Sequence, residues 1–487
     1  MFGKKKTAPP TVPTDEVVPM HDWDDKPHNR QMVVEFTYRF DDVLDAAKLK
    51  HALERLLEIG NWRKLGARVR LNAQGKLDYH IPQRYDEQRP GFLWDHLDIA
   101  DSIEDHPLAS QLAKAKPEPT IFEDPEKFHS LTAHPDHPTC LDDWIYSDRP
   151  PLSLRLVTFT DASLLTLSWS HTLLDAVGRQ SLLEAWIAVL EGREQDVPPI
   201  IGFKDDPALN MGKTSKPEQH VLYKRMITGF RFFLFVVYFI LEKVLHPKED
   251  ARLIQVPNSF VQNLKREAQD HLRAQSPEKE APFLSDADVL FAWMTRLTYV
   301  AQNYSPQRTV TLMNVINFRG LTDALPLQGA AYIGNAVGSS QSFLTVQQAK
   351  EQPIAVTALL IREDLLRQKT PEQVDAVLAI SRQLGRGPLF GAYDQLLTPW
   401  SNWHRARFYE MDFSSAVSSK NSQARTGKAR IGKPSYLHVC GHRGSFMVRN
   451  GGALLGKDGA GNWWISWNLR AEAWEKFEAE FYKATRQ

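Results

Sequence analysis

The chain contains little cysteine and carries no net charge. Its 487 residues include two cysteines, Cys140 and Cys440, which form no CxxC pair and no disulfide framework. This pattern favours a reducing, intracellular compartment. Lysine plus arginine and aspartate plus glutamate both number 59, so no bulk charge attracts the chain to nucleic acid. We therefore expect a cytoplasmic protein that does not bind nucleic acid.

Long apolar runs are also absent. The run FFLFVVYFIL, residues 232–241, is about half as long as the roughly 20 apolar residues that a membrane-spanning helix needs. Two interpretations of residues 230–245 are open: a helix that docks on the protein itself or on a partner, or a helix that lies on a membrane surface and associates the protein with it. Residues 1–20 are polar and rich in proline where a signal peptide would be apolar, and we expect a flexible tail there.

Several motifs of nucleotide enzymes and hydrolases are missing as well. The sequence has no P-loop, no GxGxxG after a strand, no GxSxG and no HExxH. Nucleotide hydrolases, dinucleotide oxidoreductases, α/β-hydrolases and zinc peptidases depend on these patterns. The sequence therefore argues against all four classes.

Strand-like and helix-like segments alternate and predict an α/β (α+β) fold in two halves of similar size. In the first half, residues 32–40 have the pattern of a strand and residues 152–171 that of a hairpin, each followed by a helix-like segment. In the second half, Ser285 and Asp288 are spaced like a capping box at the start of a helix. We expect an N-terminal domain at 21–205, a crossover with the apolar helix at 206–250, and a C-terminal domain at 251–487.

One short stretch carries candidate chemistry. In SWSHTLLDAVG, residues 168–178, a strand-like run leads to His171, and a helix-like segment follows at once. A histidine in such a place can accept a proton near neutral pH, as a general base must. Asp175 lies four residues later, where it can turn back and fix the local loop instead of contacting substrate. By itself the HxxxD pattern is weak evidence, because a chain with 16 histidines contains such spacings by chance.

Two other clusters could bind a ligand, but each also has an interpretation without one. His129, His134, His137 and Cys140 have spacings that suit zinc, but prolines after two of the histidines disfavour a helix that would align the ligands, and we expect no metal site. The stretch SSKNSQARTGKARIGKP holds five basic residues and no acid. It forms either a solvated loop or a surface that attracts the phosphates of an anionic ligand. The five residues are Lys420, Arg425, Lys428, Arg430 and Lys433.

A second motif strengthens the interpretation of His171 as a catalytic base. MDFSSA, residues 411–416, follows HxxxD in an order that resembles the BAHD-type acyl-CoA-dependent acyltransferase family, in particular its fungal secondary-metabolite branch. Further segments support this resemblance over nearly the whole chain: LSDADVLFAWMTR, NFRGLTDALPLQGAAYIGN, WSNWHRARFYEMDFSSA and GNWWISWNL. The resemblance implies two chloramphenicol acetyltransferase-like domains with mixed sheets, joined by a long crossover, with an active-site channel between them.

The resemblance also implies roles for single residues. Acyl-CoA is expected as a co-substrate, with no tightly bound cofactor, and a small-molecule acceptor reaches His171 from the other side. His171 takes the acceptor's proton and returns it to the thiolate of CoA. Trp403 is placed to donate its indole N–H to the tetrahedral oxyanion, and Asp412 to tie its loop by a salt bridge. Arg319 suits either phosphate binding or an ion pair that holds Asp175.

Weaker matches fall on stretches that contact CoA in relatives: Ser285, Asn317, Ser401 and Asn402. Two departures from the family's pattern concern the site itself. The glycine of HxxxDG is replaced by Ala176, with Gly178 following two residues late, and the plant-type DFGWG reads DFSSA. The mouth of the channel near CoA must therefore differ, which leaves the size of the acyl donor open.

The sequence thus predicts a monomeric O- or N-acyltransferase that works through a ternary complex. It would transfer acetyl or another short acyl group to a hydroxyl or amine of a polyketide or terpenoid. The alternatives are a non-standard reaction on the same fold (cyclisation, lactonisation or acyl transfer from a carrier protein) and a non-catalytic binding protein. Ser170 precedes His171 where carrier-dependent condensation domains carry a second histidine, and this disfavours the carrier-protein version.

Overall fold

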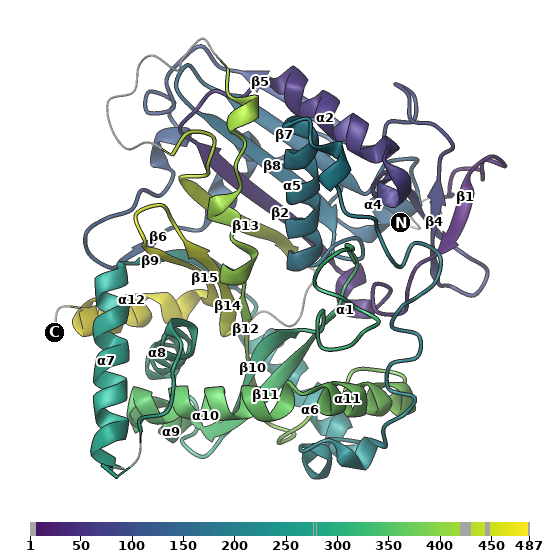
Figure 1. Cartoon of the computed structure of the whole chain (residues 1–487). Coiled ribbons are helices and arrows are strands. Elements are labelled where there is room, and N and C mark those ends of the chain that lie inside the picture. The colour runs from purple at the N-terminus through teal and green to yellow at the C-terminus, as the bar shows by residue number, and fades with distance from the viewer. Residues whose placement is uncertain (1–5, 276, 279, 419–429, 444–448, 486–487) are drawn as a thin grey trace.

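The computed structural model describes residues 6–275, 277–278, 280–418, 430–443 and 449–485. Two large sheets lie side by side, each covered by helices, and a small third sheet flanks the first (Figure 1). Both large sheets mix parallel and antiparallel pairs, because β5 is parallel to β7 and β12 is parallel to β10 and β14. The predicted α/β (α+β) fold with mixed sheets is confirmed.

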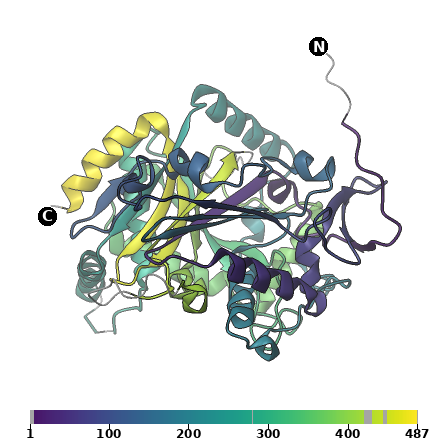
Figure 2. The same cartoon turned by 90° about the horizontal axis from the view of Figure 1, so that it is seen from above.

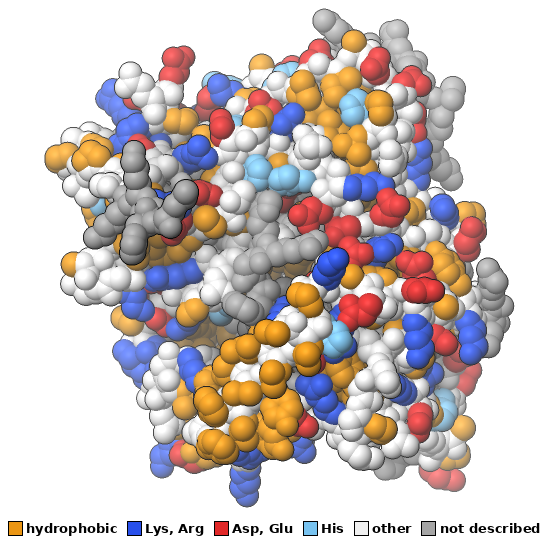
Figure 3. Space-filling view, turned by 180° about the vertical axis from the view of Figure 1, so that it is seen from behind, with side chains coloured by type: hydrophobic (Ala, Val, Ile, Leu, Met, Phe, Trp, Pro, Cys, Tyr) orange, Lys and Arg blue, Asp and Glu red, His pale blue; other side chains and the backbone are white. Residues whose placement is uncertain are grey.

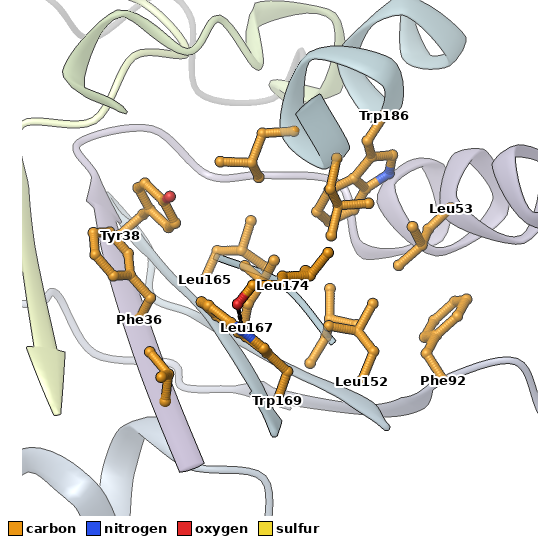
Figure 4. Close-up of a cluster of buried hydrophobic side chains, with 14 of the residues drawn as sticks. Phe36, Tyr38, Leu53, Phe92, Leu152, Leu165, Leu167, Trp169, Leu174 and Trp186 are labelled. Atoms are coloured by element: carbon orange, nitrogen blue, oxygen red, sulfur yellow. Dashed lines mark hydrogen bonds between the residues drawn. The ribbon is translucent and has the colours of Figure 1, made fainter. Parts of the chain in front are cut away.

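The first sheet has five strands in the order β13-β2-β8-β7-β5. They are β13 (Tyr436–Arg443), β2 (Met32–Phe40), β8 (Ser163–Ser170), β7 (Leu152–Thr158) and β5 (Leu93–Asp98). The helices α2 (Ala46–Glu58) and α5 (Ala176–Leu190) cover one face. Between them and the sheet lies an apolar core with Phe36, Leu167 and Trp186 (Figure 4). Asp45 starts α2 by accepting from the backbone N–H groups of Ala47 and Lys48.

The second sheet has seven strands in the order β11-β10-β12-β14-β15-β9-β6. They are β11 (Val337–Thr345), β10 (Thr309–Asn317), β12 (Leu396–Asn402), β14 (Gly451–Lys457), β15 (Trp463–Arg470), β9 (Glu249–Val256) and β6 (Thr120–Phe122). Its helices are α7 (Asn258–Gln275), α8 (Asp286–Ala301), α9 (Val346–Glu351), α10 (Ile354–Gln368), α11 (Pro371–Leu384) and α12 (Trp474–Thr485). The expected capping box at Ser285 and Asp288 is present at the start of α8.

The remaining elements are short. The third sheet consists of β1 (Glu16–Pro19), β4 (Leu77–Ile81) and β3 (Arg68–Leu71), and the short helices are α1 (Pro27–Arg30), α3 (His129–Thr132) and α4 (Leu141–Ile145). The prediction of a flexible tail over residues 1–20 is wrong at Glu16–Pro19, which pair with β4. Next to this strand, the carboxylate of Asp15 forms two hydrogen bonds of 2.8 Å with Arg89, which fix the chain there.

The two halves exchange strands. β13 comes from the C-terminal half of the chain but pairs along its whole length with β2, in the first sheet. β6 comes from the N-terminal half but pairs with β9, in the second sheet. Figure 2, the view from above, shows chain segments from both ends lying side by side in the middle of the molecule. The boundary between the halves in space therefore differs from any single boundary along the chain.

The apolar segment forms the helix α6 (Gly229–Leu245), and none of its residues is buried. Phe230 is 71% exposed, Val244 68% and Leu245 70%. The helix contacts the body of the protein, as the self-docking interpretation expects, but its apolar side chains are not buried there. Within the residues described, no helix is both long enough and apolar enough to cross a membrane.

The side chains of the histidine-rich stretch contact one another and Glu35. The rings of His129 and His137 pack against each other with their Nε2 atoms 3.0 Å apart, and Glu35 lies 3.2 Å from Nδ1 of His129. Cys140 is exposed at the start of α4. Among the described residues, no group of three or more histidine, cysteine, aspartate or glutamate side chains is arranged to hold a metal ion.

Candidate active site

His171 directly follows the last residue of β8. Its backbone N–H donates to the carbonyl of Met32 at 2.9 Å, which extends the pairing of β8 with β2 by one residue. The side chain is half-buried, and its Nδ1 atom is buried without a well-formed hydrogen bond within the described structure. Burial lowers the pKa of His171 below its ordinary value of 6.5, although its own carbonyl and the charge of Asp175 act against this shift. The imidazole is therefore neutral at pH 7.

Asp175 caps the helix that follows. Its Oδ1 atom accepts from the backbone N–H groups of Val177 at 3.1 Å and Gly178 at 2.8 Å, at the N-terminus of α5. Its Oδ2 atom accepts from the backbone N–H of Ala336 at 3.0 Å, which belongs to the other half of the chain. The carboxylate is thus held by helix and loop backbone, as the interpretation of Asp175 as a loop-fixing residue requires.

Arg319 forms a two-point ion pair with Asp175. Its Nη1 and Nη2 atoms lie 2.9 and 3.0 Å from the two carboxylate oxygens, and both side chains are almost fully buried. The other N–H groups of Arg319 donate to Tyr332 O, Asn317 Oδ1 and Gly334 O. A guanidinium has five N–H donors, and all five are used here. Of the two roles left open for Arg319, the structure shows the ion pair, and the assignment of Arg319 to the phosphates of CoA is wrong.

Asn317 contacts Arg319 of the ion pair, and Asn335 contacts the backbone of His171. Asn317 Oδ1 accepts from both the backbone N–H and Nη1 of Arg319, so this predicted CoA contact lies against the ion pair. The Nδ2 group of Asn335 donates to the carbonyl of His171 at 2.8 Å and to Asp24 Oδ1 at 2.8 Å. Asp24 also accepts from the backbone N–H of Asn335, and burial raises the pKa of Asp24 to about 6. Neither Asp24 nor Asn335 was predicted from the sequence, although Asn335 ends the family-like segment AAYIGN.

The late glycine after HxxxD has a packing role. A Cβ atom on Gly178 would come within 1.9 Å of the carbonyl oxygen of Ile333, so the first turn of α5 lies directly against the backbone of the other half. A similar contact occurs at Gly334, where a Cβ atom would lie 2.7 Å from Asp24 Oδ2. Both glycines allow the two halves to meet at the level of His171.

Arg179, one turn after Asp175 in α5, is a buried arginine of a different kind. Its side chain is 1% exposed, and its Nε and Nη2 atoms have no hydrogen-bond partner in the described part of the chain. The guanidinium carbon lies 3.5 Å from the ring centre of Phe36 and 3.8 Å from that of Phe408. Burial lowers the pKa of Arg179 to about 10. In the described chain, each of the other buried arginines has a hydrogen bond: Arg68, Arg70, Arg155, Arg319, Arg449 and Arg470.

Trp403 lies beside Arg179. The guanidinium carbon of Arg179 is 5.2 Å from its ring centre, and Phe36 is 5.9 Å from it on the neighbouring strand β2. Trp403 is half-buried and packs against the core of the first half, although it follows β12 of the second sheet. The structure therefore brings Trp403 and Arg179 together, and of the two only Trp403 was predicted from the sequence.

The DFSSA motif attaches the second half of the chain to the first. Phe413 is fully buried, with ring centres 5.5 Å from both Phe40 and Trp186. The carbonyl of Ala416 accepts from the backbone N–H of Asp45 at 2.7 Å. Asp412 is half-exposed; its Oδ1 accepts from Ser414 N at 3.0 Å and its Oδ2 lies 3.9 Å from Lys433 Nζ.

Only part of the basic stretch is described. Arg430 pairs with Glu410, and Lys433 lies 3.8 Å from the same carboxylate. Lys420, Arg425 and Lys428 lie outside the described residues. The two described cations of the stretch therefore already have acidic partners.

The remaining predicted CoA contacts lie on the second half. Ser285 caps α8 and donates to Asp288, which also accepts from Arg362 at 2.8 Å. Ser401 and Asn402 end β12, and Asn402 accepts from the backbone N–H of His404. Close to this region the pKa of Lys369 is lowered, first by burial and then by the positive charges of Arg405 and Arg362. Neither Lys369 nor Arg405 has an ion pair among the described residues, and so this side of the second half carries unneutralised positive charge.

A cleft of about 740 Å³ lies between the halves. Its walls come from α5, from residues 193–199 and 327–331, and from residues 407–412, including Asp412. The volume lies in the range of small-molecule sites, roughly 300–1,000 Å³. His171 is not part of its lining, so the cleft and the histidine are separate features of the same seam between the two halves.

Comparison with known proteins agrees with this architecture. A family profile described as "Transferase family" matches residues 137–426. The chain is 38% identical over 482 residues to "Acetyltransferase adrJ" of Penicillium roqueforti, covering 98% of this chain and 97% of the relative. It is 37% identical to a Penicillium decumbens protein named "Transcriptional regulator calD", covering 99% of both chains. The solved structure of TRI101 from F. sporotrichioides, complexed with coenzyme A and T-2, matches with a TM-score of 0.67 at 16% identity, over 96% of this chain and 98% of that one.

The fold and these relatives define an acyltransferase with mixed sheets. The chain belongs to the Transferase family, the BAHD-type acyltransferases, as the sequence resemblance predicted.

Replacing Arg319 by methionine should destabilise the protein by about 3–5 kcal/mol, because it leaves the carboxylate of Asp175 buried without its partner. The free energy of unfolding from urea titration measures this effect. Arg273→Met is the matched control, since Arg273 pairs with Asp270 at the surface with both side chains 60% exposed. That change should cost less than about 1 kcal/mol. Equal effects of the two substitutions would contradict a central role for the Asp175–Arg319 pair.

Proposed function

We propose that the chain transfers an acetyl or other short acyl group from acyl-CoA to a hydroxyl or amine of a secondary metabolite, with His171 as the general base. One observation carries this proposal. His171 directly follows β8 and has a half-buried, neutral imidazole, while the neighbouring carboxylate of Asp175 is bonded to the start of α5 and to Arg319. A base near neutral pH must be unprotonated and reachable, and this environment supports both properties.

In the proposed reaction, one proton passes from the acceptor to His171 and then to the thiolate of CoA. The acceptor's oxygen or nitrogen attacks the thioester carbonyl and forms a C–O or C–N bond as its proton passes to Nε2 of His171. The tetrahedral intermediate then collapses, the C–S bond breaks, and the imidazolium returns the proton to the thiolate of CoA. The carbonyl of His171, held by Asn335, fixes the position of the residue during both transfers. Both substrates are bound at once, so no acyl-enzyme forms.

We assign the stabilisation of the oxyanion to Trp403 and Arg179. Trp403 carries an indole N–H, and the buried guanidinium of Arg179 has two nitrogen atoms without hydrogen-bond partners among the described residues. Donors fixed in an apolar surrounding stabilise developing negative charge more than the same donors in water. The cage formed by Phe36 and Phe408 holds the cation in place without a competing carboxylate.

We assign the phosphates of CoA to the cations near the start of α8 and the end of β12. Within the described part of the chain, Arg405 and Lys369 have no acidic partner there, while Ser285, Ser401 and Asn402 lie on the same half of the chain. The coenzyme A in the TRI101 complex supports acyl-CoA as the donor, and the T-2 in the same complex supports a small-molecule acceptor. The name of the Penicillium roqueforti relative supports an acetyl group.

The alternative of a non-catalytic protein is favoured by one observation, the name of the relative from Penicillium decumbens. The intact His171 and Asp175 favour the enzyme. A reaction other than intermolecular acyl transfer, such as lactonisation, would use the same base. We propose a cytoplasmic monomer; the low number of cysteines, two in 487 residues, supports a reducing compartment.

His171→Ala should lower acyl transfer by a factor on the order of 10²–10⁴, the range for loss of a general base. Binding of CoA, measured by calorimetry, should be unchanged, and exposed His51→Ala is the control. In the wild type, kcat/KM should fall with decreasing pH only below 6.5, because the pKa of His171 is lowered from that value and only the neutral imidazole accepts a proton. Turnover near the wild-type level in His171→Ala would exclude this mechanism.

Arg179→Met should reduce kcat by about 10²–10³, as expected for loss of an oxyanion donor. The free energy of unfolding should stay within about 1 kcal/mol of the wild type or increase, because the substitution removes a buried charge that has no carboxylate partner in the described chain. Urea titration and steady-state kinetics on the same preparation measure both. A loss of stability in proportion to the loss of activity would mean that Arg179 has a structural role only.

Replacing both Lys369 and Arg405 by serine should raise KM for acetyl-CoA and leave kcat unchanged. The increase should be larger at low than at high salt, since exposed charges are screened beyond about 10 Å at 0.1 M salt. Lys50→Ser, on α2 of the other half, is the control. A KM that does not change at either salt concentration would place the phosphates of CoA elsewhere.

A further inference from the structure

The helix α6 presents a continuous apolar stripe to the outside of the molecule. Figure 3 shows a concentration of hydrophobic side chains on one face, where α6 lies. The outward residues follow the helical spacing i, i+3, i+10, i+11, i+14 and i+15, so they line one side of the helix. They are Phe230 at 71%, Phe233 at 58%, Ile240 at 52%, Leu241 at 49%, Val244 at 68% and Leu245 at 70% exposure.

The helix is fixed to the body by polar contacts at its C-terminal end. Glu242 accepts from Tyr304 Oη at 2.9 Å and contacts Arg470, with Arg308 3.7 Å away. Arg449 donates to the carbonyl of Glu242 at 3.0 Å. The one acidic side chain of α6 is therefore turned inward and neutralised by arginines. The apolar stripe stays outward because these contacts hold the side of the helix that carries Glu242 against the body.

The N-terminal end of α6 is fixed by a different contact. The guanidinium carbon of Arg386 lies 3.7 Å from the ring centre of Phe232, and Ile227, just before the helix, is fully buried. The helix is thus held at both ends in one orientation. An exposed stripe of this size on a folded protein marks an interaction surface.

Cations without an ionic partner among the described residues lie near both ends of the stripe. Lys224 and Arg231 are exposed near its N-terminal end and Lys248 beyond its C-terminal end, and none of the three has an ion pair among the described residues. A second copy of the chain on this surface in a symmetric dimer would bring these like charges toward each other. An anionic membrane surface complements them, and interfacial helices of this composition lie flat with their apolar side in the lipid.

We infer that α6 is an interfacial anchor that docks the protein on the surface of a membrane containing anionic lipids. The helix has 17 residues and a length of about 25 Å, which is enough to lie along the interface and too short to span it. The anchor depends on α6 and its neighbours alone and does not rest on the proposed acyl transfer.

Flotation of the full chain with phosphatidylcholine vesicles, with and without phosphatidylserine, tests the anchor. The wild type should float with the vesicles, and more strongly when phosphatidylserine is present and salt is low. The variant Phe230→Ser/Phe233→Ser/Val244→Ser should bind about ten-fold less or weaker still, since interfacial binding scales with the apolar area inserted. These side chains are exposed, so the variant should keep the circular dichroism and thermal unfolding of the wild type.

Two further variants separate the contribution of the apolar stripe from that of the nearby cations. Leu209→Ser/Leu366→Ser removes exposed apolar side chains elsewhere (55% and 61% exposed) and should float like the wild type. Lys224→Ser/Arg231→Ser should lose the preference for phosphatidylserine and keep the weaker binding to phosphatidylcholine. The inference is overturned if the wild type stays at the bottom of the gradient with both kinds of vesicle. It is also overturned if lipid-free ultracentrifugation shows a dimer that the triple variant converts to monomer.

Discussion

The ion pair between Asp175 and Arg319 is the interaction on which the candidate site depends. Asp175 starts α5 and belongs to the first half, whereas Arg319 follows β10 in the second. The same carboxylate accepts from Ala336, and Arg319 donates to the carbonyls of Tyr332 and Gly334. Taking two charges out of water is costly, and such a pair persists only when every donor and acceptor is satisfied. Here all five N–H groups of the arginine are satisfied, and the geometry of the seam follows from that requirement.

The position of His171 follows from this ion pair. Three residues separate His171 from Asp175. At one end of this loop, His171 continues the pairing of β8 with β2, and at the other end Asp175 caps the start of α5. Asn335, next to the backbone that Asp175 holds, reaches back to the carbonyl of His171. The imidazole therefore lies at a point fixed from both halves. Arg179, one turn further along α5, differs from Arg319. Its neighbours are aromatic, and two of its nitrogen atoms have no hydrogen-bond partner among the described residues. Buried polar groups without a hydrogen-bond partner require an explanation, and a catalytic role is one.

The sequence predicted the elements with strong local patterns and failed where distant residues decide. The capping box at Ser285 and the hairpin of residues 152–171 depend on neighbours within a few positions, and both are present. HxxxD is local too, so His171 and Asp175 could be singled out. The partner of Asp175 lies 144 positions away, which is why two roles stayed open for Arg319. Asp24 and Asn335 are 311 positions apart, and the segment that ends at Asn335 does not indicate its partner. At α6, composition indicated an apolar helix, but only the fold determines that its apolar side faces outward.

The exchange of strands limits how ligands can reach His171. β13 and β6 each belong to the sheet of the opposite half, and separating the halves would break the ladders that these strands form. Phe413 adds an apolar contact across the same boundary, because it is buried against Phe40 and Trp186. A hinge motion that opens the seam would expose all of these groups together with the Asp175–Arg319 pair. In the proposed reaction, substrates would therefore reach His171 through small movements of side chains and loops and not through separation of the halves.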